Sequence, residues 1–339
     1  MASIDVAIPS YNYGRYLRDC VQSVLSQEGV DLRVLIVDNA STDDSPQIAR
    51  ELAASDSRVE LCLRERNLGQ HASFNQGVDW AEADYFAILC ADDLLPLGAL
   101  ARAVAIMEQN PDVNLVYGRT EFVPSAFSPS TLALPSQPAD FRIFSGQEFL
   151  EIFCRTGRSP IGGPTAIVRT AAQKRAGHYL TSLPHTDDVE MWMRIACLGS
   201  VAEIDAVQLY ARIHEANQSA AVSNVHSWNL EMEQAFAAFF SGAGAALGQA
   251  RRLHRMACRS LAHRAYWCAV SHVLRGEPGA PDLMRFALRL RPTLALVPPL
   301  GSLFSRADAL DRIRATLKAR LSARPTDHAE ESSALRRKA

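Results

Sequence analysis

Short apolar runs alternate with stretches of helical periodicity in the N-terminal third of the chain. Four mostly apolar runs predict buried strands, at residues 4–8, 32–37, 59–63 and 84–90. Between them, apolar residues recur every three or four positions and predict helices, after Gly14, from Pro46 onward and at residues 71–81. Strands that alternate with helices in this way form a mostly parallel, doubly wound sheet with helices on both faces, so we expect an α/β fold.

Each of these strands leads into a polar segment. The four segments lie at residues 10–14, 38–41, 67–69 and 92–93. Since the carboxyl ends of parallel strands meet at one edge of the sheet, where ligands of such folds bind, we expect the segments to form one site.

The pattern changes towards the C-terminus. Further helices are predicted at residues 100–107 and 146–155, and further strands at 113–117, 162–169 and 201–209. A segment rich in Pro, Ser and Ala, residues 124–138, predicts a surface loop over the site. From Val225 only helical periodicity remains, with helices expected around residues 228–239, 253–270, 283–290 and 307–321. We therefore divide the chain into residues 1–222, a helical region 223–322 and a disordered tail 323–339.

Composition narrows the class of protein. With 339 residues and 48% hydrophobic composition the chain can bury a large core. The seven cysteines are scattered without a Cys-x-x-Cys pair, which favours a reducing cytoplasm and no zinc site. No apolar run is long enough to predict a signal peptide or a membrane span, so we expect a cytoplasmic protein.

The net charge of −2 conceals an asymmetry between the two parts of the chain. Residues 1–250 carry 17 Lys and Arg against 30 Asp and Glu, whereas residues 251–339 carry 18 against 7. Five arginines lie on the polar faces of the predicted C-terminal helices: Arg251, Arg252, Arg255, Arg259 and Arg264. This basic part is expected either to face an anionic surface, such as the inner face of the cell membrane, or to pair with acids of the N-terminal domain. No nucleic-acid-binding motif accompanies the charge, so we expect no nucleic-acid partner.

Two adjacent carboxylates, Asp92 and Asp93, follow the buried strand at residues 84–90. Two anions beside an apolar strand repel each other and resist desolvation, so a divalent cation would stabilise them together. The structural alternative is that the pair caps the helix that begins near Leu97.

A second acidic pair, Asp187 and Asp188, lies in the first turn of a predicted amphipathic helix. The helix dipole favours anions at this end, and Met191, Ile195 and Leu198 share the apolar face.

Four segments follow predicted strands in this order: Ile8-Pro9-Ser10-Tyr11-Asn12, Val37-Asp38-Asn39-Ala40-Ser41-Thr42-Asp43, Arg66-Asn67-Leu68-Gly69 and Ala91-Asp92-Asp93. Together they resemble the GT-A domain of family 2 inverting glycosyltransferases. The resemblance covers residues 4–220 and implies a nucleotide-diphospho-sugar donor and a bound Mg²⁺ or Mn²⁺.

The resemblance also implies roles for individual residues. Those expected to bind the nucleotide are Pro9, Tyr11, Asn12, Asp38, Asn67, Gly69 and Asp92, with Asp38 holding the base through its ring N–H. Those expected at the metal are Asp92, Asp93 and His214. One departure is that Cys90 stands where many relatives carry the first carboxylate of Asp-x-Asp-Asp, which leaves open which of Asp92 and Asp93 contacts the metal.

Asp188 matches the catalytic base of the family's Glu-Asp-x-x-x-Trp pattern, with Asp187 where Glu is usual. Inversion at the anomeric carbon requires that an acceptor hydroxyl lose a proton, and one carboxylate serves this purpose. Each of these residues also has a structural alternative to a functional role, as a turn residue, a helix cap or a surface residue. This applies to Asn12, Asn67, Asp38, Tyr11, Tyr13, Asp187, Asp188 and His214.

The expected function is therefore metal-dependent, inverting sugar transfer from UDP or dTDP to a saccharide or lipid-linked saccharide, in cell-surface polysaccharide or glycolipid synthesis. A nucleotidyltransferase and a non-catalytic sugar-nucleotide-binding module are the alternatives. The first would be expected to carry a Lys-containing phosphate loop near the N-terminus, and residues 1–30 contain no lysine.

Overall fold

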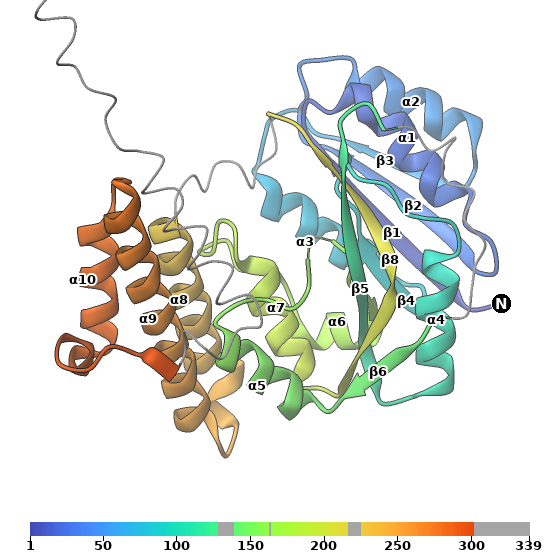
Figure 1. Cartoon of the computed structure of the whole chain (residues 1–339). Helices are drawn as coiled ribbons and strands as arrows, with labels where there is room; N and C mark the ends of the chain where they lie inside the picture. Colours follow the sequence, from blue (N-terminus) through green and yellow to red (C-terminus); the bar gives the residue numbers. More distant parts are fainter. Residues whose placement is uncertain (128–138, 163, 216–224, 302–339) are drawn as a thin grey trace, which may run out of the picture.

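The computed structural model describes residues 1–127, 139–162, 164–215 and 225–301. In these residues an eight-stranded sheet runs in the order β3-β2-β1-β4-β7-β5-β8-β6 (Figure 1). The strands are β1 (Ser3–Ser10), β2 (Asp31–Asp38), β3 (Val59–Leu63), β4 (Tyr85–Ile88), β5 (Val113–Pro124), β6 (Phe141–Phe144), β7 (Ile167–Arg169) and β8 (Ser200–Ile213).

The N-terminal half follows the predicted alternation of strands and helices. Strands β1 to β4 are mutually parallel where they pair. They are joined by α1 (Gly14–Leu25), α2 (Ser45–Ser55) and α3 (Gln70–Trp80). Helix α2 carries Pro46 in its first turn, where the fixed φ of proline suits a helix start. The predicted α/β fold class is confirmed. The prediction succeeded because the long apolar runs of the sequence are typical of strands that are buried on both faces.

The second half departs from the prediction in three places. The strand expected at residues 162–169 is shorter in the structure, where β7 spans Ile167–Arg169. Strand β7 is antiparallel to both β4 and β5, and the unpredicted edge strand β6 is antiparallel to β8. Strand β8 continues past the predicted end at residue 209 to Ile213. In addition, Leu198 lies beyond the end of its helix, α7 (Asp187–Ala196).

Helices cover both faces of the sheet. Helices α1, α2 and α4 (Ala99–Gln109) pack on one apolar cluster, while α3, α5 (Gly146–Thr156) and α7 pack on the other. The short helix α6 (Thr170–Ala176) follows β7.

The C-terminal helices share the second apolar cluster. They are α8 (Val225–Ser241), α9 (Ala250–Arg275) and α10 (Ala280–Leu290), with the 3₁₀ turns η3 (Ala243–Ala246) and η4 (Pro292–Ala295). Met232, Leu253 and Phe286 belong to the same cluster as Phe86 of β4. Figure 1 shows these helices beside α5 and α7, on the side of the sheet away from α1 and α2.

Three expectations fall on residues that the structure does not describe. The domain boundary at residue 222 lies within residues 216–224. Most of the predicted surface loop lies within residues 128–138. The predicted helix at 307–321 and the predicted tail lie beyond residue 301. Within the described ranges, none of the helices has both the length and the apolar character needed to cross a membrane.

Candidate functional site

The ends of β1, β2 and β4 meet at one edge of the sheet. Ser10 and Asp38, the last residues of β1 and β2, pair directly. After β4, Leu89 continues along β1 by donating its amide hydrogen to the carbonyl of Ala7 at 3.0 Å. The chain crosses from β3 back to the other side of β1 to form β4, and ligands of doubly wound sheets bind at such a reversal. The acidic segment after β4 therefore lies at the expected binding edge.

Strand β8 holds the acidic pair from the far side. Leu94 and Tyr210 form an isolated antiparallel bridge, with N–H to carbonyl distances of 3.0 and 2.9 Å. The bridge brings the amide of Arg212 to 3.2 Å from Asp93 Oδ1. Asp93 is thus fixed by residues 119 positions away in the sequence.

His214 reaches the same pair. Its Nε2 lies 3.0 Å from Asp92 Oδ2, and both side chains are almost fully buried. The ring stacks on Tyr16 at a centroid distance of 4.9 Å and meets the edge of Tyr13 at 5.8 Å. Tyr13, expected on the surface, is therefore partly buried against His214, because the loop after β1 folds over the site. The structure thus brings His214 to the predicted metal position, while its role stays a prediction.

The acidic pair is electrostatically suited to a cation. Burial raises the pKa of Asp92, and burial together with the charge of Asp92 raises the pKa of Asp93 well above its usual value. Donor atoms of Cys90, Asp92 and Asp93 all lie within 4.8 Å of one another. A divalent ion would compensate this repulsion, so the residues fit the metal that the sequence suggested.

Asp38 carries an acceptor with no partner among the described residues. Its Oδ1 accepts from the amide of Ser41 at 3.0 Å, whereas its buried Oδ2 has no hydrogen bond there. A buried carboxylate oxygen without a donor is costly, so it suits a ligand N–H. Nearby, Tyr11 is 41% exposed at the edge of the site, and Pro9 lies within β1.

Asn12 joins two loops of the site. Its side-chain Oδ1 accepts from the main-chain N–H of Thr42 at 2.8 Å. Its main-chain N–H donates to Ser41 Oγ at 2.9 Å. Asn12 has φ of 59°, a left-handed conformation that asparagine tolerates. Its side-chain oxygen is therefore engaged in shaping the site.

Asn67 acts similarly in the loop before α3. Its Oδ1 accepts from Asn39 Nδ2 at 2.7 Å and from the amide of Gly69 at 2.8 Å. Gly69 has φ of 82°, which favours glycine. Arg64, which sequence reasoning missed, donates to Asn39 Oδ1 at 3.0 Å and to Gln76 Oε1 at 2.7 Å. The only signal for Arg64 in the sequence was its position directly after the last residue of β3.

Asp188, the candidate base, lies in the first turn of α7 and accepts from the amide of Val189 at 2.6 Å. Burial and the charge of Asp187 raise the pKa of Asp188. Burial contributes most to the raised pKa of the Cys90 thiol, and Asp188 is among the acids that raise it further. The charge of Asp188 therefore acts on the acidic segment after β4.

Asp187 is more enclosed than Asp188. Its Oδ2 lies 3.5 Å from Nε2 of His71, which α3 contributes. Burial raises the pKa of Asp187, and the charges of Glu231 and Glu190 add to the effect. Asp187 therefore lies buried near other acids in the first turn of α7, and the role of the pair stays a prediction.

Arg212, which lies in the sequence motif around His214, was not among the predicted site residues. Its guanidinium donates to Asp19 Oδ2 at 2.7 Å and to the carbonyl of Phe127 at 2.9 Å. Its side chain is 1% exposed. These residues border a cavity of about 270 Å³ together with Arg15 and Tyr16. The one available signal was an arginine near His214.

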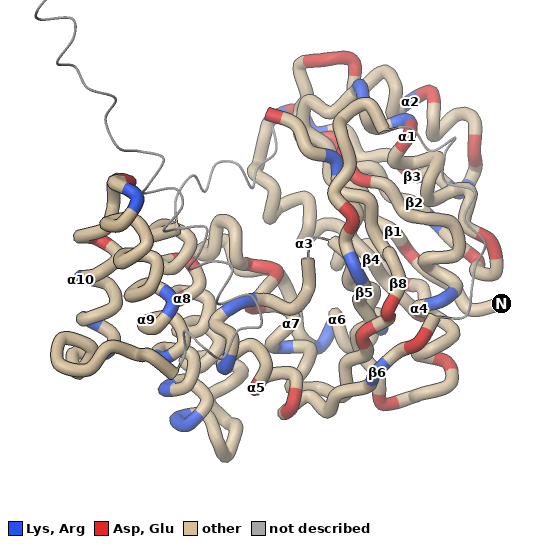
Figure 2. Tube along the Cα trace, in the orientation of Figure 1, with Lys and Arg blue, Asp and Glu red and all other residues tan. Residues whose placement is uncertain are grey.

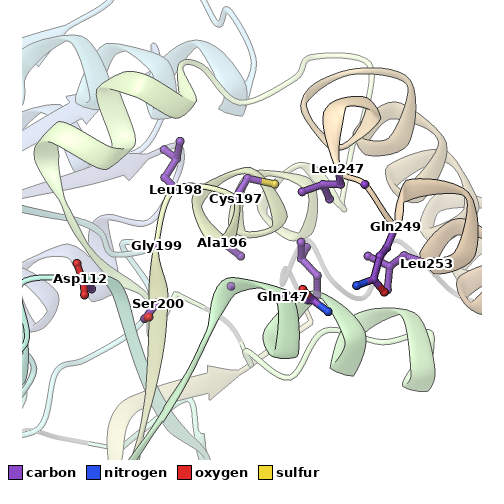
Figure 3. A pocket seen from close by; sticks show the side chains of 13 residues that line it. Asp112, Gln147, Ala196, Cys197, Leu198, Gly199, Ser200, Leu247, Gln249 and Leu253 are labelled. Carbon is purple, nitrogen blue, oxygen red and sulfur yellow. The ribbon is translucent and has the colours of Figure 1, made fainter.

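A second cavity lies away from these residues. It has a volume of about 620 Å³ and is formed where the start of α5, the end of α7 and the start of α9 meet. Figure 3 shows Gln147, Cys197 and Gln249 at its walls. None of the predicted site residues lines it, so we do not assign the chemistry to this cavity.

Comparisons with known proteins find similarity to glycosyltransferases. Residues 5–163 match the family model described as Glycosyl transferase family 2. An uncharacterized glycosyltransferase of Methanocaldococcus jannaschii is 26% identical over 207 residues, which are 60% of this chain and 68% of that protein. The glycosyltransferase GlyG of Streptococcus pneumoniae is 34% identical over 92 residues, 27% of this chain and 31% of GlyG.

Solved structures agree on the fold. The TarS 1-349 fragment of S. aureus in complex with UDP-GlcNAc gives a TM-score of 0.62 at 17% identity, covering 96% of this chain and 93% of that one. The mannosyltransferase PcManGT of Pyrobaculum calidifontis, in complex with GDP-Man and Mn²⁺, gives a TM-score of 0.53 at 19% identity. The match covers 94% of this chain and 86% of PcManGT. The family match over residues 5–163, the relatives and the solved structures together support a family 2 glycosyltransferase.

Proposed function

We propose that this glycosyltransferase moves a sugar from a nucleotide-diphospho-sugar to an acceptor hydroxyl with inversion at the anomeric carbon. The observations that support the proposal best are two groups at one sheet edge and a third in the first turn of α7, whose charge acts on Cys90. They are the unpartnered oxygen of Asp38, the buried pair Asp92 and Asp93, and the enclosed carboxyl of Asp188. The first suits a base N–H, the second a cation, and the third a proton.

In the proposed reaction the acceptor oxygen attacks the anomeric carbon and forms the new glycosidic bond. The bond from that carbon to the diphosphate oxygen breaks, and its electron pair leaves with the nucleoside diphosphate. Asp188 accepts the proton of the acceptor hydroxyl. Burial favours this role because a carboxylate with a raised pKa binds a proton more tightly.

We further propose that Asp92, Asp93 and His214 hold Mg²⁺ or Mn²⁺, with Cys90 beside them. Oxygen ligands suit both ions. When bound, the ion supplies positive charge that stabilises the leaving diphosphate. The mannosyltransferase PcManGT is described with Mn²⁺, which supports the proposal by analogy of fold.

For the donor we propose UDP or dTDP as the nucleotide. Asp38 can accept the ring N–H that uracil and thymine share, and TarS is described with UDP-GlcNAc. PcManGT is described with GDP-Man, so the fold also serves a purine. As acceptor we propose a saccharide or lipid-linked saccharide, in cell-surface polysaccharide or glycolipid synthesis.

We also propose peripheral contact with the inner face of the cell membrane. Figure 2 shows Lys and Arg along α9 and α10 with few acids, while acids are spread over the sheet domain. Several arginines there pair with acids, such as Arg252 with Glu151 at 2.8 Å. Arg251, Arg255 and Arg259 are exposed, four residues apart, and have no ion pair within the described part of the chain. Their spacing places them on one face of α9.

Thermal unfolding in the presence of UDP-, dTDP- and GDP-sugars with Mn²⁺ tests the donor assignment. A ligand at about 100 times its Kd stabilises a protein by about 2.7 kcal/mol. We expect a UDP- or dTDP-sugar to stabilise most, and release of nucleoside diphosphate to separate an enzyme from a non-catalytic binding module. Absence of stabilisation by any nucleotide sugar would overturn the proposal. The family match favours glycosyl transfer over the nucleotidyltransferase alternative.

A further inference from the structure

The segment that leads to the candidate base is held from one side by α3. Gln70 Nε2 donates to the carbonyl of Pro184 at 2.7 Å, and His71 Nε2 lies 3.1 Å from the carbonyl of Leu183. These contacts span more than 110 positions of the sequence. They fix the segment against the nucleotide-binding half of the sheet domain.

Glu231 of α8 holds the same segment from the other side. Its Oε2 accepts from the backbone amide of His185 at 3.1 Å, and its Oε1 lies 2.8 Å from His185 Nδ1. The hydroxyl of Thr186 donates to the main-chain carbonyl of Glu231 at 3.3 Å. The carboxylate is only 16% exposed, so solvent competes weakly for these bonds.

These bonds control how α7 begins. Thr186 is the N-cap residue of α7, yet its side chain makes no capping hydrogen bond to that helix. Its hydroxyl is used by α8 instead. The next two residues are Asp187 and Asp188, so the orientation of the first turn is set by a contact with the C-terminal helices.

Helix α8 is itself firmly anchored. Arg264 of α9 donates from Nε at 2.9 Å and from Nη2 at 2.5 Å to Oδ1 of Asn229, which lies two residues before Glu231 in α8. The same guanidinium donates to the carbonyl of Gly157, at the end of α5, at 2.9 Å. Glu231 is therefore presented by a frame that joins α5, α8 and α9.

We infer that Glu231 is a positioning residue for sugar transfer: through His185 and Thr186 it orients the turn that carries Asp188. This inference rests on the proposed role of Asp188 as the base. It gives the C-terminal helices, which lie outside the family match at residues 5–163, a part in catalysis. A displacement of about 1 Å at a reacting group can cost on the order of a hundredfold in rate.

The test compares Glu231→Gln with Glu233→Gln in the full chain. Glu233 lies on the same helix and pairs with Arg289 of α10 at 2.6 and 2.8 Å, so its replacement removes a carboxylate of similar exposure. Release of nucleoside diphosphate from the nucleotide sugar gives kcat. Titration with UDP, dTDP and GDP gives nucleotide affinity, and thermal unfolding gives stability.

We expect Glu231→Gln to lower kcat about 10- to 100-fold and to leave nucleotide Kd within about twofold, whereas Glu233→Gln changes neither. Equal rates in the two variants would overturn the inference, as would a loss of nucleotide affinity that parallels the loss of rate. Should Glu231→Gln fail to fold, Thr186→Val removes only the hydroxyl contact and must lower kcat selectively. Asp188→Asn is measured alongside. If Asp188→Asn remains active, the proposed assignment of the base is wrong. If Asp188→Asn is inactive while Glu231→Gln has a normal kcat, only the positioning role of Glu231 is refuted.

Discussion

At the scale of single residues, the acids of the site were visible in the sequence because each follows a buried strand or opens a helix. What the sequence could not show is how each is held. Asp38 has an unpartnered oxygen, whereas the side-chain oxygens of Asn12 and Asn67 are bonded within the loops. Such differences depend on contacts between loops about 30 residues apart.

Asp93→Ala should abolish turnover and weaken donor binding in Mn²⁺ with little loss of fold stability. Its carboxyl is buried beside that of Asp92, so its removal relieves repulsion and also removes a proposed metal ligand. Turnover and donor titration with Mn²⁺ or with excess chelator measure the effect. Undiminished activity of the wild type in chelator would defeat the metal assignment.

The rate should fall in acid because burial and the charge of Asp187 raise the pKa of Asp188 to about 7. Below that pH the carboxyl is protonated and cannot accept the acceptor's proton, so kcat should fall about tenfold per pH unit. Asp187→Asn removes a charge that raises this pKa, so the acid limb should move to lower pH. A kcat profile from pH 5 to 9 measures both, and a limb that stays in place or moves upward would contradict this coupling.

At the scale of elements, the strands with long apolar runs were predicted nearly to the residue, and the strands of the second half were not. Strand β6 is short and lies at the sheet edge, with Phe141 and Ile143 about 40% exposed, so its pattern carries little signal. The extension of β8 to Ile213 depends on pairing with β5 and on the bridge to Leu94, which are distant in sequence. This extension is what delivers Arg212 to the site.

Arg212→Gln should therefore destabilise the fold by about 1–3 kcal/mol, because a buried side chain loses its bonds to Asp19 and to the carbonyl of Phe127. Arg119→Gln on β5 is the matched control. Its ion pair with Asp205 is exposed, so the expected cost is below about 1 kcal/mol. Urea unfolding measures both, and equal costs would show that the Arg212 contacts add nothing.

At the scale of the whole molecule, the helical C-terminal region was predicted from periodicity, but its packing was not. It shares one apolar cluster with the sheet domain, and Glu231 reaches the segment before Asp188. The charge asymmetry was also visible in the sequence. Only the structure shows which of the C-terminal arginines pair with acids.

Arg251, Arg255 and Arg259 replaced together by Gln should release the protein from vesicles that contain phosphatidylglycerol. Three basic residues near an anionic surface contribute about 3 kcal/mol, on the order of a hundredfold in affinity. A triple replacement of Arg275, Arg285 and Arg289 by Gln removes the same charge from residues that pair with acids, so it should bind nearly as the wild type does. Sedimentation at low and high salt measures binding. No co-sedimentation of the wild type at low salt, or equal loss in both triple variants, would refute the membrane contact.

The most direct test of the proposed function is Asp188→Asn, which keeps the shape of the side chain and removes its basicity. Nucleoside diphosphate release and nucleotide Kd are measured on the same preparation. We predict that kcat falls about 10²- to 10⁴-fold while nucleotide Kd stays within about twofold of the wild-type value. A rate close to that of the wild type, or a loss of nucleotide binding together with the rate, would contradict the assignment of Asp188 as the catalytic base.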